Sequence, residues 1–254
     1  MTGTHRFLKA AVFLLLCGPA LVPSRAEKPG LQVQSPSLIP LRPVTPQVIF
    51  HGNRKSKRIA LTFDACSTGE PGGYDERITE VLTGTGTKAT IFLGGAWMES
   101  QPDHTRQLAS NALFELGNHS YLHPHMTRIG ADRMREELLR TQAILFALAG
   151  RQASLFRPPY GEYNSTLVKV AAECGLTTIQ FDLASGDPDR HFTKEKLTDW
   201  VTSQARGGSI VVMHINGRGW HTAEALPEII SRLRARGFEF VKVSELLAAV
   251  QTAP

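Results

Sequence analysis

Residues 58–64 read Arg-Ile-Ala-Leu-Thr-Phe-Asp, a short apolar and β-rich run that ends on a carboxylate. The run predicts a strand over 58–63, with Asp64 at its end. From here on, β-rich runs alternate with helix-like segments about seven times. This alternation predicts a single α/β domain with a parallel sheet, which is either open or closed into a barrel.

The remaining elements are expected at regular intervals along the chain. The further strands are expected at 88–93, 113–117, 154–157, 176–182, 209–214 and 238–242. The helices are expected at 74–83, 102–110, 131–149, 164–174, 193–205, 222–236 and 244–251. The helix at 131–149 has the clearest pattern, because apolar residues recur at helical spacing and Gly150 follows.

The composition is that of a globular protein, with 42% hydrophobic and 20% charged residues in 254, which excludes a collagen-like or wholly disordered chain. The net charge is +5, but the first 26 residues hold three basic residues and no acid. The rest therefore carries 25 basic against 23 acidic residues. Because the basic residues form no continuous stripe, nucleic-acid binding is not expected.

Residues 1–26 have the pattern of a secretory signal peptide. Arg6 and Lys9 precede an apolar run at 10–22, and Ser-Arg-Ala at 24–26 fits a cleavage site. The run is shorter than the roughly 20 residues that span a bilayer. We therefore expect a periplasmic or secreted protein with no membrane span after cleavage, an uncleaved anchor being the alternative. Residues 27–50 contain five prolines and predict an extended linker before a domain at 51–254.

Polar motifs follow five of the expected strands. They are Asp64, His-Ser-Tyr-Leu-His at 119–123, Arg-Pro-Pro-Tyr-Gly at 157–161, Ser-Gly-Asp at 185–187 and Met-His at 213–214. In a barrel of parallel strands such ends meet at one face, so these motifs are expected to form one site. Each alone also has a structural interpretation: a cap for Asp64, an ordinary turn for 157–161, a hydrogen-bonded structural histidine for His214.

Two of these motifs indicate specific chemistry. The spacing of His119 and His123 predicts both imidazoles on one side of a single helical turn, as two ligands of a Zn²⁺-type ion, with His125 as a neighbour. The two prolines and the glycine at 158–161 predict a rigid loop that holds Arg157 and a backbone N–H in fixed positions. Asp187 precedes Pro188, which keeps its carboxylate in a loop.

Cleavage after residue 26 would leave two cysteines, Cys66 and Cys174. In an exported protein they form either a disulfide or two separate buried thiols, and the sequence leaves both open.

Taken together, these motifs resemble the polysaccharide deacetylases with a NodB homology domain, carbohydrate esterase family 4, over about residues 58–250. The resemblance implies a distorted (β/α)7-type barrel that hydrolyses N-acetyl groups on sugars with a divalent ion, Zn²⁺ being preferred. It makes Asp64 the general base, and His119 and His123 metal ligands. The family's third ligand is an Asp directly after the base, where this chain has Ala65. Asp64 itself, a displaced carboxylate such as Asp75, or waters would then complete the shell.

The other motifs acquire roles by the same resemblance. Arg157 holds the base, and the main-chain N–H of Tyr160 helps to stabilise the oxyanion. His214 is the general acid, and Asp187 orients Arg157 or tunes His214. Pro188 replaces an aromatic residue often found there, so one wall of the sugar cleft is expected to differ.

The sequence thus predicts an exported N-deacetylase of peptidoglycan or a chitin-like oligomer. Because of Ala65, a metal-free amidohydrolase, an O-acetyl esterase and a carbohydrate-binding pseudoenzyme remain alternatives. The aromatic residues that are candidates for stacking on a sugar are Trp97, Trp200 and, favoured by its place after His214, Trp220.

Overall fold

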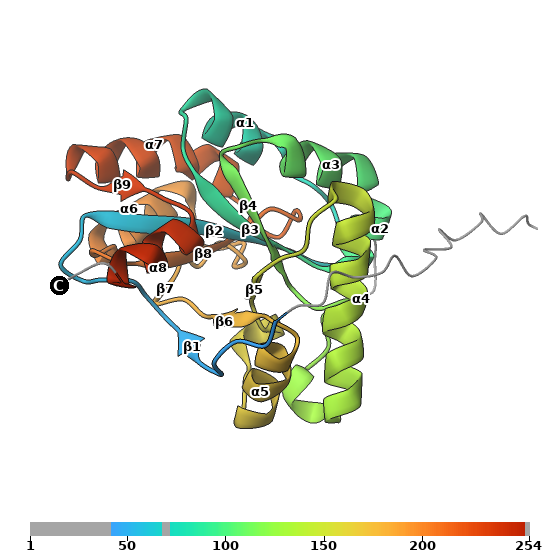
Figure 1. The fold of residues 1–254 in the computed structure, drawn as a ribbon. Helices are drawn as coiled ribbons and strands as arrows, with labels where there is room; N and C mark the ends of the chain where they lie inside the picture. Colours follow the sequence, from blue (N-terminus) through green and yellow to red (C-terminus); the bar gives the residue numbers. More distant parts are fainter. Residues whose placement is uncertain (1–41, 68–71, 252–254) are drawn as a thin grey trace, which may run out of the picture. The chain divides into compact units, whose positions relative to one another are not determined.

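A parallel sheet forms the centre of the protein in a computed structural model that describes residues 42–67 and 72–251 (Figure 1). The strands in these ranges are β1 (Val48–Ile49), β2 (Arg58–Ala65), β3 (Ala89–Leu93), β4 (Phe114–Asn118), β5 (Leu155–Phe156), β6 (Thr177–Ile179), β7 (Leu183–Ala184), β8 (Ile210–His214) and β9 (Glu239–Phe240). The expected signal peptide at 1–26 lies outside the described residues.

The strand order decides whether the sheet is open or closed into a barrel, which the sequence did not determine. It runs β1-β6-β5-β4-β3-β2-β8-β7, with β9 beside β2, and the strand pairings are parallel. Among the described residues no pairing joins β1 to β7, so the sheet is an open half-barrel. The predicted single α/β domain of the barrel type is confirmed.

Helices cover the outside of this sheet, with α1, α3, α4 and α7 at the periphery of the molecule in Figure 1. Within the described ranges the helices are α1 (Glu76–Gly84), α2 (Gly95–Ser100), α3 (Pro102–Ser110), α4 (Ala131–Ala149), α5 (Ser165–Glu173), α6 (Lys194–Gln204), α7 (Thr222–Ala235) and α8 (Val243–Gln251). Two 3-10 turns, Met126–Arg128 and Pro159–Gly161, lie between them. None of the helices in the described part of the chain is long and apolar enough to cross a membrane.

The predicted helix at 131–149 is confirmed as α4, and its end has a clear cause. Gly150 adopts φ 67°, a left-handed conformation that costs glycine little, and its N–H donates to the Phe146 carbonyl (2.8 Å). Three short elements were not predicted: α2, β7 and β1. The last of these, residues 48–49, lies in the segment expected to be a linker and pairs with β6.

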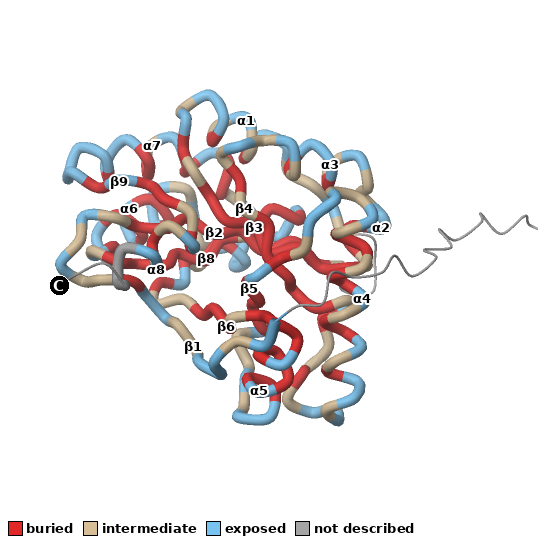
Figure 2. Tube along the Cα trace, viewed as in Figure 1, coloured by how far each residue is buried: buried red, intermediate tan, exposed pale blue. Residues whose placement is uncertain are grey.

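Strand β2 lies between β3 and β8 in the sheet, with the main hydrophobic core on one face and the functional side on the other. Leu61, Phe63 and Ala65 are fully buried in the main hydrophobic core, which the helices cover. Burying a side chain such as Phe63 contributes about 1.5–3 kcal/mol. Because side chains alternate along a strand, Thr62 and Asp64 face the other side. Figure 2 shows the central strands as almost continuously buried, with exposed residues on the outer faces of the helices.

Candidate functional site

A cavity of about 270 Å³ lies at the carboxyl ends of the strands. All seven residues predicted for the site line it: Asp64, His119, His123, Arg157, Tyr160, Asp187 and His214. The parallel sheet brings them together, because strands that point the same way place their following loops at one edge.

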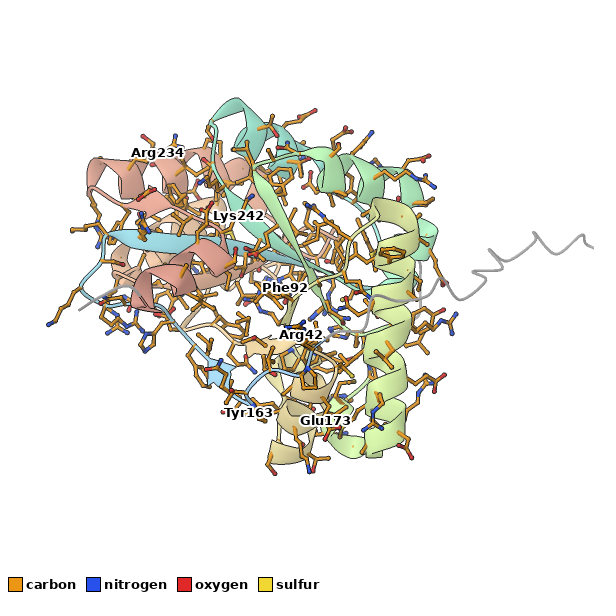
Figure 3. The ribbon with its side chains drawn as sticks, viewed as in Figure 1. Arg42, Phe92, Tyr163, Glu173, Arg234 and Lys242 are labelled. Atoms are coloured by element: carbon orange, nitrogen blue, oxygen red, sulfur yellow. The ribbon has the colours of Figure 1, made fainter. Side chains whose placement is uncertain are left out.

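Asp64 and Arg157 form a buried ion pair on the floor of this cavity. Arg157 Nη1 donates to Asp64 Oδ1 (2.9 Å) and to the hydroxyl of Thr62 (2.7 Å), and only 1% of Arg157 is exposed. Its guanidinium lies 4.2 Å from the ring centre of Phe92, which Figure 3 labels near the middle of the sheet. Burial raises the pKa of Asp64, but the charge of Arg157 and of nearby histidines outweighs it and holds the pKa below its ordinary value. Asp64 is therefore a carboxylate with one oxygen fixed.

His214 stands directly beside Asp64. The two are register partners on the neighbouring strands β8 and β2, which places their side chains on the same face of the sheet. Burial lowers the pKa of His214, but the hydrogen bond and charge of Asp187, with the charge of Asp64, outweigh both burial and Arg218, so the pKa lies above its ordinary value. An ionised carboxylate and a protonated imidazole can thus coexist in one cavity.

Both carboxylate oxygens of Asp187 accept hydrogen bonds, which fixes the orientation of this side chain. Its Oδ1 lies 2.9 Å from His214 Nδ1, and its Oδ2 accepts from the His214 backbone N–H (2.7 Å) and from the Thr222 hydroxyl (2.7 Å). The Ser185 hydroxyl donates to Oδ1 (2.9 Å). Of the two partners considered from the sequence, Asp187 therefore contacts His214, while Arg157 binds Asp64.

His119 and His123 lie on an irregular loop after β4, so the prediction of a single helical turn was wrong. His119 continues the line of β4, and its N–H donates to the Leu93 carbonyl (3.0 Å). Ser120 and His123 adopt φ of 62° and 58°, which is left-handed backbone that a helical turn excludes. The loop nevertheless brings the two rings together, with centres 4.9 Å apart.

The loop is held in this conformation by Glu137 of α4. Glu137 is 1% exposed, and its Oε2 accepts from the backbone N–H groups of Tyr121 (2.8 Å) and Leu122 (2.7 Å). Arg133 Nη2 donates to the other oxygen at 2.7 Å. Sequence reasoning missed Glu137, because its position on an amphipathic helix gives no sign of a contact with the histidine loop.

The two histidines have nitrogen atoms suited to a metal ion. His119 Nδ1 lies 2.8 Å from the Arg157 carbonyl, so it carries the N–H and leaves Nε2 as an acceptor, 3.8 Å from Asp64 Oδ2. His123 Nδ1 is buried without a hydrogen-bond partner. Burial is the main cause that lowers the pKa of His123 to about 3, so its imidazole is neutral. Neutral imidazoles with a free lone pair fit a divalent cation.

A third donor, Cys66, accompanies them. Its Sγ and one nitrogen from each of His119 and His123 all lie within 4.8 Å of one another, and all three residues are buried. Burial, with the charge of Asp64, raises the pKa of the Cys66 thiol to about 12. Cys66 and Cys174 are separate buried thiols, so the alternative of a disulfide between them is excluded.

Asp75, the carboxylate suggested from the sequence besides Asp64, does not reach the cavity. Ala65 packs in the hydrophobic core. Asp75 caps α1 and is engaged by Arg77, whose Nη2 donates to its Oδ2 at 2.8 Å. Asp75 does not line the cavity. The prediction that a displaced Asp75 could complete a metal shell is therefore wrong.

Tyr160 forms one rim of the cavity. Its backbone has φ 58° in the turn Pro159–Gly161, a left-handed conformation that the flanking residues Pro159 and Gly161 help to fix. The ring stacks on His125 (centres 4.2 Å apart, planes at 13°). His125 Nδ1 in turn lies 2.9 Å from Glu162 Oε2, so His125 is a neighbour of the site, as expected.

The tryptophans differ in their access to a sugar. Trp97 is fully buried, and its Nε1 donates to the Gly73 carbonyl (3.0 Å), so it is a core residue and its candidacy was wrong. Trp200 and Trp220 are both exposed, and the backbone N–H of Trp220 donates to the Asp187 backbone carbonyl (3.1 Å). Pro188 lines the cavity at the position where an aromatic wall was expected to be missing.

Similarity to known proteins shows the family of this chain. Residues 51–179 match the family model described as "Polysaccharide deacetylase". Peptidoglycan-N-acetylmuramic acid deacetylase PdaA of Bacillus subtilis is 30% identical over 201 residues, which cover 78% of this chain and 74% of PdaA. Its solved structure matches with a TM-score of 0.70 at 28% identity, over 78% of this chain and 84% of that one.

Two further relatives differ in activity. A peptidoglycan-N-acetylglucosamine deacetylase of Bacillus cereus is 30% identical over 200 residues, 78% of this chain and 70% of that one. A structure described as a CE4 family pseudoenzyme from Bacillus anthracis matches with a TM-score of 0.72 at 30% identity, over 80% of this chain and 69% of that one. On the family match and these identities, the chain belongs to the polysaccharide deacetylase family, carbohydrate esterase family 4 with the NodB homology fold.

Proposed function

We propose that this chain is an exported, metal-dependent hydrolase that removes N-acetyl groups from an N-acetylated glycan, either peptidoglycan or a chitin-like oligomer. The observation that carries the proposal is the pair Asp64 and His214, which share one cavity while their pKa values shift in opposite directions. Such a pair supplies a base and an acid at the same pH. The relatives named as peptidoglycan deacetylases support the substrate class, and the signal pattern at 1–26 supports export.

Hydrolysis of an amide first needs an activated water, and Asp64 is placed to provide it. Arg157 fixes Oδ1, so the other oxygen, Oδ2, takes a proton from a water in the cavity. A lowered pKa keeps this carboxylate ionised and ready as a base. General-base assistance of this kind is worth roughly 10²–10⁴-fold in rate.

The second need is a proton for the departing amine, and His214 is its source. Nδ1–H of the imidazolium donates to Asp187, so the Nε2–H faces the amide nitrogen and protonates it as the C–N bond breaks. The products are acetate and the free amino sugar. The N–H of Tyr160, on its rigid turn, stabilises the oxyanion without reorganisation.

His119 and His123 would hold the divalent cation, for which zinc is the preferred choice because these protein ligands are imidazoles. A cation at this place supplies Lewis-acid polarisation of the acetyl carbonyl and lowers the pKa of a bound water, to about 7 in favourable sites.

A second candidate, a carbohydrate-binding protein without turnover, is favoured by one observation. Ala65 occupies the position of the family's metal Asp, and one of the similar structures is a pseudoenzyme. The intact set of Asp64, Arg157, Asp187 and His214 argues against it, because binding alone needs no acid–base pair.

Acetate release from N-acetylglucosamine oligomers and from peptidoglycan fragments, with and without a chelator, separates these functions. The deacetylase predicts acetate release that the chelator abolishes. Release that survives the chelator indicates the metal-free amidohydrolase, and release from an O-acetylated sugar alone indicates the esterase. Binding of the oligomer without acetate indicates the pseudoenzyme.

A further inference from the structure

The mechanism above leaves one buried nucleophilic side chain unused at the centre of the site. Cys66 is 3% exposed and lines the cavity beside the two histidines. It lies two residues after Asp64, and its thiol has no disulfide partner.

The phase of β2 explains why position 66 reaches the histidines and position 65 does not. Side chains alternate along an extended segment, so Asp64 and Cys66 share the cavity side, whereas Ala65 packs among core residues. A donor from this segment therefore comes from residue 66.

The three donor atoms lie close enough that small movements of their side chains would let one cation bind all of them. Cys66 Sγ and one nitrogen from each histidine lie within 4.8 Å of one another. Donors in a tetrahedral zinc site stand roughly 3.3–3.6 Å apart, so closure needs shifts of no more than about 1.5 Å. His123, 8% exposed, contributes a buried Nδ1 that has no hydrogen-bond partner.

The surroundings of the Cys66 sulfur also favour a metal-bound thiolate. Asn216 is 4% exposed, and its Nδ2 lies 3.4 Å from Cys66 Sγ and donates to the Cys66 carbonyl at 2.8 Å. An amide N–H directed at sulfur stabilises a metal-bound thiolate and fixes its orientation. Asn216 thus has the position of an outer partner of a thiolate ligand.

We infer that the Cys66 thiolate is the third protein ligand of the cation, which makes the site Cys-His-His. On binding, the thiol releases its proton to solvent and a sulfur–metal bond forms, with no change of oxidation state. The inference deepens the proposed function and rests on it only in requiring that a cation binds. A thiolate ligand selects zinc over magnesium, calcium or manganese.

Cobalt and zinc binding test this ligand without using activity. The variants are Cys66→Ala and Cys66→Asp, and Cys174→Ala is the matched control, because Cys174 is also a buried thiol but does not line the cavity. Cobalt-loaded wild type and the Cys174→Ala variant should show a thiolate-to-cobalt charge-transfer band in the near ultraviolet, and both Cys66 variants should lack it. Zinc affinity, measured by competition with a chromophoric chelator, should fall at least about 100-fold in Cys66→Ala, and Cys66→Asp should restore part of it.

A charge-transfer band that persists in Cys66→Ala, or that is absent from the cobalt-loaded wild type, overturns the inference, as does a wild type that binds no metal. If Cys66→Ala fails to fold, zinc X-ray absorption of the wild type decides: one sulfur at about 2.3 Å supports the inference, and a shell of nitrogen and oxygen alone refutes it. Sulfur-bound zinc in a protein that releases no acetate supports Cys66 as a ligand and refutes the deacetylase function. Acetate release by a protein whose zinc has no sulfur ligand supports the deacetylase function and refutes Cys66 as a ligand.

Discussion

At the scale of single residues, the chemistry of Asp64 depends on its contact with Arg157. An isolated buried carboxylate would hold its proton, because burial disfavours charge. The guanidinium 2.9 Å away reverses that preference and also occupies one of the two oxygens. Asp64 is therefore charged and oriented at the same time.

Replacing Asp64 by Asn removes the proposed base while keeping the shape of the side chain. We expect acetate release to fall at least about 10²-fold, because the amide cannot accept the proton of water. Circular dichroism should show a folded protein. Activity within a few-fold of wild type in this variant would exclude Asp64 as the base.

Replacing Asp187 by Asn tests how His214 is kept protonated. Asp187, Asp64 and Arg218 are the charged groups that influence His214, and Asp187 raises its pKa most. The general acid is lost as pH rises through this pKa. Removing the Asp187 charge lowers the pKa, so the alkaline limb of the pH–rate profile should move to lower pH.

The control for this shift is Asp189→Asn, an exposed neighbour on the same loop. The profile of acetate release against pH should be unchanged in the control. An alkaline limb that stays in place in Asp187→Asn contradicts the assignment of His214 as the acid.

Residue motifs in the sequence predicted which side chains gather at the cavity, but not all of their contacts. Whether Asp187 serves Arg157 or His214 depends on β7 lying beside β8, which no spacing in the sequence reveals. The position of Cys66 beside the two histidines was not predicted for a related reason. Its orientation depends on the strand continuing in phase beyond Asp64.

At the scale of elements, the loop after β4 is the part of the site under most local strain. Two non-glycine residues in left-handed conformations, Ser120 and His123, cost of order 1–3 kcal/mol each. The side-chain oxygens of Asn118, Ser120 and Glu137 accept hydrogen bonds from backbone N–H groups of the loop, and these bonds offset that cost.

Removing Glu137 should release this loop. In Glu137→Ala the N–H groups of Tyr121 and Leu122 lose their acceptor, and each lost partner costs about 1–3 kcal/mol. We expect the free energy of unfolding to fall by about 3 kcal/mol in chemical denaturation, together with weaker zinc binding. Glu136→Ala, next to it but exposed, should change both by little. Equal effects of the two substitutions would refute the role of Glu137.

Elements were predictable where several local signals agree. Helix α4 has a long apolar stripe and a terminal glycine, and its bounds follow from both. The strands β1 and β7 have two residues each and α2 has six, which is too short for a periodic pattern. The spacing of His119 and His123 is compatible with a helical turn as well as with an irregular loop. The hydrogen bonds that Glu137 of α4 accepts from the backbone hold the segment as a loop.

At the scale of the whole molecule, the proposed cation would link the site to stability. Its proposed ligands come from the end of β2 and from the loop after β4, so a cation that joins them would bind the folded chain and not the unfolded one. The sequence predicted the class of fold, but the open edge between β1 and β7 follows from strand order, which alternation alone does not determine.

Zinc should therefore raise the thermal stability of the metal-free protein. At a free zinc concentration about 100 times Kd the expected gain is about 2.7 kcal/mol, lost again on chelation. His119→Ala removes one ligand and should abolish both stoichiometric metal, measured by elemental analysis, and the zinc-dependent rise in melting temperature. A variant with unchanged metal content would refute His119 as a ligand.

The most direct test of the whole account is zinc titration of metal-stripped protein during acetate release from an N-acetylated oligomer. The account predicts no release at the start and a linear rise that ends at one zinc per chain. Metal-free protein that releases acetate as fast as the loaded protein, or loaded protein that releases none, would contradict it.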